Sequence, residues 1–206
     1  EAEVRLAAGG KVLFTPRATD LDPAKSPPMK KVPVFWNIQM TVRPPQNRTP
    51  RFDAMLGLLC DPQHPALAEF PTDRNCDWQW TPIVDGVRSV RRRAAPRELK
   101  PSGAAIDDWN RNWRLGVIFE CRVGPGRLLV SAIDFAKNTT PGAQQLHRSL
   151  LDYAASDKFR PVASLTVEQV RGLWVTGAGP GAEPAKRAFD RDLDDGSGRQ
   201  PAPRKS

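Results

Sequence analysis

The sequence predicts a mixed α/β domain in which a sheet carries helices on both faces. Strand-length apolar runs alternate with helical patterns in the first half of the chain. Later, a glycine-containing turn joins two strand-length runs, residues 115–123 and 127–135, and this pattern is typical of a β-hairpin. Apolar residues then recur at helical spacing over residues 141–156, which predicts an amphipathic helix behind the hairpin.

The chain begins with a pattern that indicates the end of a helix followed by a strand. Val4, Leu6, Ala7 and Ala8 look like the last turns of a helix, Gly9-Gly10 suits its C-terminus, and residues 11–15 predict a buried strand. In an α/β unit a strand should precede this helix, and the first residue is not methionine. We therefore expect the chain to be the C-terminal piece of a longer protein.

The middle of the chain mixes short apolar runs with proline-rich loops. Residues 32–40 predict a short strand or extended segment, and residues 54–60 predict a strand that ends at Asp61. Residues 64–70 have room for one or two helical turns before a proline. Residues 101–113, with two acids and two indoles, predict a short helix or a tight loop.

The C-terminal part predicts two capped helices and then a tail. Thr140 suits the N-cap of the helix over residues 141–156, and Thr166 with Gln169 forms a capping-box pattern before a second helix. Residues 176–206 are rich in glycine, proline and charge, which is typical of a linker or disordered tail. We expect one α/β domain over residues 1–175.

Composition excludes several classes of protein. The net charge of +8 is spread along the 206 residues with one cluster, Arg88 to Lys100. No nucleic-acid-binding motif accompanies it, so a solvated arginine-rich face is favoured over a nucleic-acid module. The three cysteines form neither a disulfide framework nor a metal-binding pattern, and we expect no cofactor. No apolar run reaches the roughly 20 residues of a membrane span.

The thiol of Cys60 occupies a sequence position that is typical of the nucleophile in many α/β enzymes. Cys60 follows an apolar strand, and His64 is four residues further on and could act as its base. A nucleophile elbow needs small neighbours, whereas Leu59 and Asp61 flank this cysteine. The pattern favours a structural thiol and leaves a hydrolase that uses Cys60 and His64 as an alternative.

Tryptophans beside hydrogen-bonding side chains are the richest chemical signal. They occur in Trp36-Asn37, Asp77-Trp78-Gln79-Trp80 and Asp108-Trp109-Asn110. Flat indoles with nearby amides and carboxylates suit the apolar face and the hydroxyls of a sugar ring. A buried tryptophan also needs a partner for its N–H group, so a structural cluster explains the same pattern. The residues alone favour the structural reading and keep the sugar site open.

Three long segments resemble a known family. LGLLCDPQHPALAEFPTD (residues 56–73), IDDWNRNWRLGVIFECRVGPGRLLVSAIDF (106–135) and QLHRSLLDYAASDKFRP (145–161) are similar to the C-terminal region of bacterial glycoside hydrolase family 2 proteins, the β-galactosidase- and β-glucuronidase-like enzymes. The resemblance covers about residues 9–173. It implies a three-layer flavodoxin-like or class I glutamine-amidotransferase-like domain, incomplete at its N-terminus and placed after the catalytic barrel. It also implies that the catalytic glutamates lie in that barrel, so we expect no catalytic residue here.

The favoured interpretation is therefore an accessory, non-catalytic domain of a glycosidase that supports or binds carbohydrate, of galactoside or glucuronide type, beside the upstream barrel of the same polypeptide. The resemblance alone favours a periplasmic or secreted protein. The alternatives are the Cys60/His64 hydrolase and the basic nucleic-acid-binding module. The residues expected to face a carbohydrate are Trp36, Asn37, Asp61, His64, Asp77, Trp78, Gln79, Trp80, Asp107 and Trp109.

Overall fold

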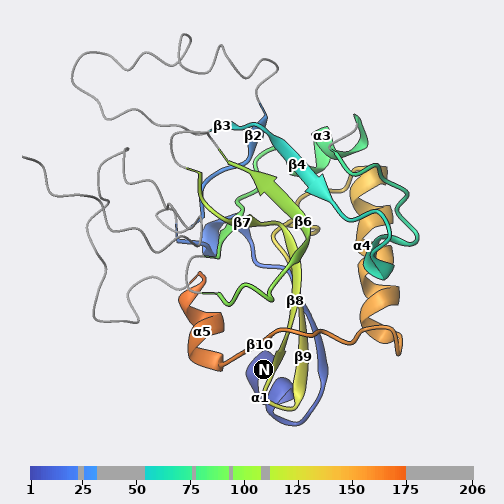
Figure 1. The fold of residues 1–206 in the computed structure, drawn as a ribbon. Helices are drawn as coiled ribbons and strands as arrows, with labels where there is room; N and C mark the ends of the chain where they lie inside the picture. Colours follow the sequence, from blue (N-terminus) through green and yellow to red (C-terminus); the bar gives the residue numbers. More distant parts are fainter. Residues whose placement is uncertain (23–25, 32–53, 76–77, 93–94, 108–111, 175–206) are drawn as a thin grey trace, which may run out of the picture.

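The computed structural model describes residues 1–22, 26–31, 54–75, 78–92, 95–107 and 112–174, and these residues form a mixed α/β fold (Figure 1). Its main sheet has the strand order β1-β9-β8-β6-β4, with β10 paired beside β8. The fold class expected from the sequence is confirmed at this level. The strands are β1 (Lys11–Phe14), β4 (Gly57–Cys60), β6 (Pro101–Ile106), β8 (Ile118–Val123), β9 (Gly126–Ser131) and β10 (Ser164–Leu165).

The predicted hairpin is confirmed and forms the centre of the sheet. β8 and β9 pair antiparallel from Ile118↔Ser131 to Val123↔Gly126, and Gly124 has the positive φ of 58° that the tight turn requires. β6 pairs antiparallel with both β8 and β4, whereas β1 runs parallel to β9 and β10 parallel to β8. The centre is thus antiparallel, unlike the parallel sheet of a flavodoxin-like fold, because a turn this short can join only antiparallel strands.

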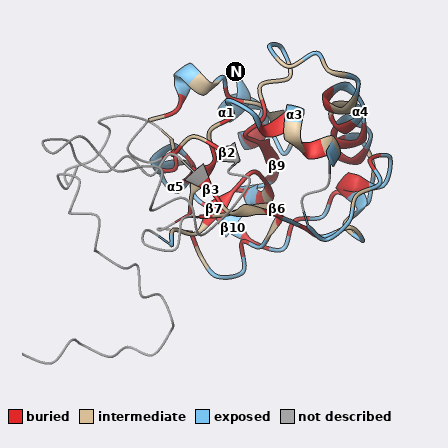
Figure 2. Ribbon diagram, turned by 90° about the horizontal axis from the view of Figure 1, so that it is seen from above, coloured by how far each residue is buried: buried red, intermediate tan, exposed pale blue. Residues whose placement is uncertain are grey.

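The helices that accompany the sheet in the described residues include α1 (Ala2–Ala7), α4 (Pro141–Ala155) and α5 (Val167–Gly172). Figures 1 and 2 place α4 and α5 on opposite sides of the sheet. The predicted caps are confirmed, since Thr140 accepts a hydrogen bond from the Ala143 amide and Thr166 forms a complete capping box with Gln169. The helix and strand predicted at the start of the chain are also present, but the residues of β1 are half-buried and not buried as expected.

Packing of α1 against the hairpin turn explains one glycine. A Cβ atom on Gly126 would lie 2.5 Å from the Leu6 carbonyl oxygen, a distance that real Cβ atoms do not adopt. Only glycine lets the helix backbone approach the start of β9 this closely. The close approach brings Leu6, which is buried, into the core.

Shorter elements complete the described fold. β2 (Lys30–Lys31) pairs parallel with β3 (Ala54–Met55), and β5 (Val90–Arg91) pairs antiparallel with β7 (Leu115–Gly116). The 3₁₀ helices are η1 (Ala18–Asp20), η3 (Pro65–Leu67) and η4 (Trp78–Trp80), and η4 continues into the short helix α3 (Thr81–Val84).

One element was predicted wrongly. Residues 101–113 were expected to form a helix or a tight loop, but residues 101–106 are the strand β6. Their small side chains carry little strand propensity of their own. The segment becomes a strand because β4 and β8 pair with its two edges. The strand expected over residues 32–40 and the tail over 176–206 lie outside the described residues.

The core forms where α4 packs on the sheet. Val117, Phe119, Cys121 and Val123 alternate along the chain, and all four are at most 3% exposed, as their period of two predicted. Figure 2 shows the buried residues concentrated between the sheet and α4. Among the described residues, no helix is both long enough and apolar enough to cross a membrane.

Candidate functional site

A groove opens at a gap along one edge of β8. β9 occupies the other edge of this strand, so β6 and β10 share the remaining one. β6 pairs with Ile118 and Phe119, β10 pairs with Arg122 and Val123, and Glu120 lies between the two pairings. The groove has a volume of about 390 Å³. Its lining residues are Asp61, His64, Glu98, Lys100, Pro101, Ser102, Glu120, Val162 and Ala163.

Glu120 joins the groove to the helix behind it. Its neighbours in β8, Phe119 and Cys121, are buried, whereas Glu120 is charged and its side chain is half-buried. The Tyr153 hydroxyl, from α4, donates a hydrogen bond of 2.7 Å to Glu120 Oε2. Burial raises the pKa of Glu120, and the hydrogen bond from Tyr153 opposes that rise. Burial also raises the pKa of Tyr153, and its hydrogen bond to Glu120 adds to the effect.

His64 is held in a defined orientation beside this pair. It is the N-cap of η3, where its Nδ1 accepts a hydrogen bond of 3.2 Å from the Ala66 amide. Its ring meets the Tyr153 ring edge-on, with 5.4 Å between centroids. Because Nδ1 accepts this hydrogen bond, the N–H group that a ligand can meet is at Nε2. His64 can therefore donate one hydrogen bond to a ligand.

Asp61 follows β4 and is fixed to the start of β6. Its backbone amide donates to the Ser102 carbonyl oxygen at 2.9 Å, and its Oδ1 accepts from the Gln63 amide at 3.2 Å. A register shift between Pro101 and Gly103 places a bulge at Ser102, whose hydroxyl donates to the Ile118 carbonyl oxygen at 3.4 Å. These contacts hold Asp61 and Ser102 on neighbouring parts of the groove wall.

The tryptophan-rich segment divides into a buried part and an exposed part. Trp80 is fully buried, its indole N–H donates to Thr72 Oγ1 at 2.7 Å, and its ring packs edge-on against Phe70. Trp80 is therefore a core residue, which corrects the expectation that it faces a ligand. Gln79 uses its amide N–H to hold the Pro71 carbonyl oxygen. Trp78 is 91% exposed.

Asp107 has a structural position. It is 5% exposed, and its Oδ2 accepts a hydrogen bond of 2.8 Å from the backbone amide of Trp113. The guanidinium of Arg91 lies 3.9 Å above the centre of the Trp113 ring, a cation–π contact. Asp107 is thus buried at the end of β6 and is not part of the groove lining. Four further candidates lie outside the described residues: Trp36, Asn37, Asp77 and Trp109.

The two thiols that the structure describes, Cys60 and Cys121, have the surroundings of structural cysteines. Cys60 is 5% exposed and is not one of the groove-lining residues, although His64 is. Cys121 is fully buried, and burial raises the pKa of its thiol to about 12. A buried thiol cannot reach a substrate in the groove, so this arrangement does not favour the Cys60/His64 hydrolase.

Three arginines of the basic cluster make contacts within the fold. Arg88 donates to the Ser26 carbonyl oxygen at 2.8 Å, and Arg91 covers Trp113. Arg92 is 7% exposed and donates to the Leu99 carbonyl oxygen, and burial lowers the pKa of its guanidinium to about 10. These arginines contribute internal contacts instead of the exposed stripe that a nucleic-acid backbone needs.

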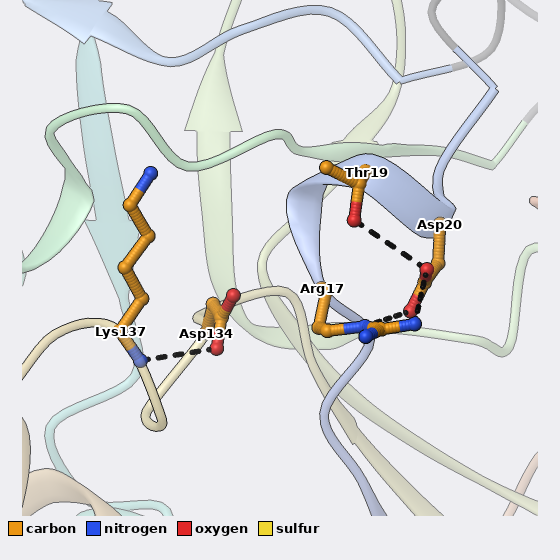
Figure 3. A network of polar contacts seen from close by, with 5 residues as sticks. All are labelled: Arg17, Thr19, Asp20, Asp134 and Lys137. Carbon is orange, nitrogen blue, oxygen red and sulfur yellow. Dashed lines mark hydrogen bonds and ion pairs between the residues drawn. The ribbon is translucent and has the colours of Figure 1, made fainter.

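A second polar network lies at the carboxyl ends of β1 and β9 (Figure 3). Arg17 binds both carboxylate oxygens of Asp20 at 2.9 and 3.0 Å, and Thr19 lies beside them. In the loop that follows β9, the Lys137 backbone amide donates to Asp134 Oδ1 at 3.3 Å. Carboxyl ends of parallel strands often bind ligands, but here the charges of Arg17 and Asp20 satisfy each other on the surface. We interpret this network as loop structure.

Comparison with known proteins supplies a family. The sequence matches, over residues 1–175, the family described as Domain of unknown function (DUF8487). The chain belongs to this family. The DUF8487 match includes every residue of the groove and of the Glu120–Tyr153 pair, and its description names no activity. A comparison with curated proteins finds no match. Within the described part of this DUF8487 chain, no group of three or more histidine, cysteine or acidic residues could hold a metal ion.

Sequence reasoning found part of the groove. Asp61 and His64 were predicted as ligand-facing, and both line it. Glu120, Ser102 and Tyr153 were missed, although the sequence holds one signal for Glu120 and one for Tyr153. Glu120 interrupts the apolar run of a strand, and Tyr153 is the single tyrosine in the sequence.

Proposed function

We propose that this DUF8487 chain is a non-catalytic accessory domain of a glycosidase related to glycoside hydrolase family 2, and that it binds carbohydrate in the groove between β6 and β10. The observation that carries the proposal is the groove itself. It gathers Asp61 and His64, which the sequence predicted, with Glu120 and Ser102, which come from distant parts of the chain. The resemblance to the glycosidases supplies the class of ligand and the catalytic barrel as partner on the same polypeptide.

The groups in the groove match the hydroxyls of a sugar. Each hydroxyl both donates and accepts a hydrogen bond. Asp61 and Glu120 offer carboxylate acceptors, and His64 offers a donor at Nε2. The volume of about 390 Å³ lies in the range of roughly 300–1,000 Å³ that small-molecule sites occupy. A monosaccharide or the end of a glycan chain is therefore a suitable ligand.

Trp78 offers a second type of sugar contact. Its indole is 91% exposed, whereas tryptophan in a soluble protein is usually well buried. An exposed indole can stack on the apolar face of a pyranose ring. The proposal requires only the mixed α/β sheet, not the flavodoxin-like layering that the resemblance implied. The burial of Cys60 gives no support to an amidotransferase-like hydrolase.

Isothermal titration with methyl β-galactoside and methyl β-glucuronide tests the proposal. Saturable binding to the wild-type chain is expected for at least one of these ligands. Asp61→Asn keeps the acceptor for the Gln63 amide but removes the charge, and it should weaken binding about tenfold, the effect of losing one hydrogen bond to a charged group. Glu69→Gln is the matched control, because Glu69 is exposed and does not line the groove. Absence of binding in a folded sample would refute the carbohydrate function.

A further inference from the structure

The groove carries an excess of negative charge. Asp61, Glu98 and Glu120 bring three carboxyl groups to its lining, and Lys100 brings one ammonium group. His64 also lines the groove; burial raises the pKa of Glu120, and the charge interaction with His64 lowers it. Glu98 and Lys100 are exposed at the rim, whereas Glu120 is half-buried, where an electrostatic interaction is screened less by water and salt.

The two carboxylate oxygens of Glu120 differ in their hydrogen bonds: Oε2 accepts one from Tyr153, and Oε1 is the other oxygen. Tyr153 donates its hydroxyl to Oε2, which fixes the plane of the carboxylate. Among the described residues, no donor is bonded to Oε1. The backbone of β8 on either side is held by β6 and β10, so the side chain cannot move away with its strand. Oε1 is therefore a fixed acceptor without a donor from the described residues, in a groove of ligand size.

We propose, on the basis of the carbohydrate function above, that the groove prefers amino sugars in their ammonium form and disfavours uronic acids, with Glu120 as the partner of the ammonium group. A carboxylate–ammonium hydrogen bond is about twice as strong as one between neutral groups. A neutral sugar can form the same contact only through a hydroxyl. A uronic acid would place its carboxylate among Asp61, Glu98 and Glu120, and like charges at close range disfavour binding.

Three matched ligands separate these possibilities: the methyl glycosides of galactosamine, galactose and galacturonic acid. We expect galactosamine to bind about tenfold more tightly than galactose because it adds one charge-assisted hydrogen bond. Galacturonic acid should bind about tenfold more weakly than galactose because its carboxylate is repelled by the groove. The advantage of the amino sugar should shrink as salt is added, whereas the affinity for galactose should change little.

Two variants assign the selection to the groove. Glu120→Gln keeps an acceptor for the Tyr153 hydroxyl but removes the charge, so it should abolish the advantage of galactosamine over galactose. Glu98→Gln changes an exposed rim residue that packing does not constrain, and it should raise the affinity for galacturonic acid while the chain stays folded. Glu69→Gln should leave all three affinities unchanged.

The outcomes distinguish this inference from the proposed function. If galactose binds but galacturonic acid binds as tightly as galactosamine, or if Glu120→Gln keeps the preference, the charge selection is wrong and the carbohydrate function stands. If no sugar binds, cyclohexylamine and cyclohexanecarboxylate serve as probes without sugar hydroxyls. Groove binding of the amine alone would then support the charge selection and refute the sugar function, whereas binding of neither would refute both.

Discussion

Trp80 and Trp78 are two residues apart and have opposite surroundings, so alanine substitutions at the two positions test the structure directly. Trp80 is fully buried among core side chains, with its ring edge-on to Phe70 at 5.0 Å between centroids and its N–H bonded to Thr72. Trp78 is 91% exposed. The two substitutions remove the same atoms from opposite environments.

The expected loss of stability at Trp80 has two contributions. Removing a fully buried tryptophan costs about 3–5 kcal/mol in lost burial and in the cavity that remains. The lost hydrogen bond leaves the Thr72 hydroxyl without its donor and adds about 1 kcal/mol. Trp80→Ala should therefore lower the free energy of unfolding by about 4–6 kcal/mol, against a total of roughly 5–15 kcal/mol for a domain. Trp78→Ala should change it by no more than about 0.5 kcal/mol.

Urea unfolding followed by far-ultraviolet circular dichroism is the suitable assay, because removing a tryptophan changes the fluorescence signal itself. The midpoint for Trp78→Ala should match that of the wild-type chain, and the midpoint for Trp80→Ala should fall sharply with the same slope. Equal losses in the two variants, or a larger loss for Trp78→Ala, would show that the placement of this segment in the core is wrong.

Further predictions concern the pKa of Glu120, the packing of glycine and the burial of a thiol. Because burial raises the pKa of Glu120 above its ordinary 4.5, the native chain holds this proton more tightly than the unfolded chain. The resulting stability is complete below about pH 4.5 and is lost as pH rises through the raised pKa. Glu120→Gln should therefore flatten the decline in Tm over that range, and an unchanged slope would contradict this prediction. Gly126→Ala should cost about 1–3 kcal/mol in a chemical denaturation curve because of the Leu6 carbonyl. In contrast, no described atom outside the adjoining helix backbone lies within 4 Å of a Cβ at Gly172, so Gly172→Ala should be neutral or stabilising by up to about 1 kcal/mol. Cys121 should react with iodoacetamide only in urea, as measured by peptide mass spectrometry, because its thiol is buried and has a pKa of about 12; rapid labelling of the folded chain would refute its burial.

Elements whose signals are local could be predicted from the sequence. The hairpin of β8 and β9 needs only two apolar runs and a glycine turn, and the capping box of Thr166 and Gln169 lies within four residues. β6 could not be predicted in this way. Its residues 101–106 have weak strand propensity, and their conformation depends on pairing with β4, about 45 residues earlier in the chain, and with β8.

In the candidate site, too, residues with a local sequence signal were predicted, and residues brought together by the fold were not. Asp61 and His64 stand together in a loop after an apolar strand, so their sequence spacing was enough to select them. The contact between Glu120 and Tyr153 joins residues 33 positions apart and exists because α4 packs on the sheet. The exposure of Trp78 and the burial of Trp80 follow from the 3₁₀ turn of η4, which the composition of the segment did not predict.

A chemical-shift titration of ¹⁵N-labelled protein with methyl β-galactoside tests the carbohydrate function of the groove most directly. We predict saturable shifts at the amides of Asp61, His64, Ser102 and Glu120, because these residues line the groove. Shifts at Glu69 and elsewhere on the surface should be negligible. A folded chain whose groove amides show no saturable shift with this ligand or with methyl β-glucuronide, or whose saturable shifts lie only at other positions, would contradict the proposed site.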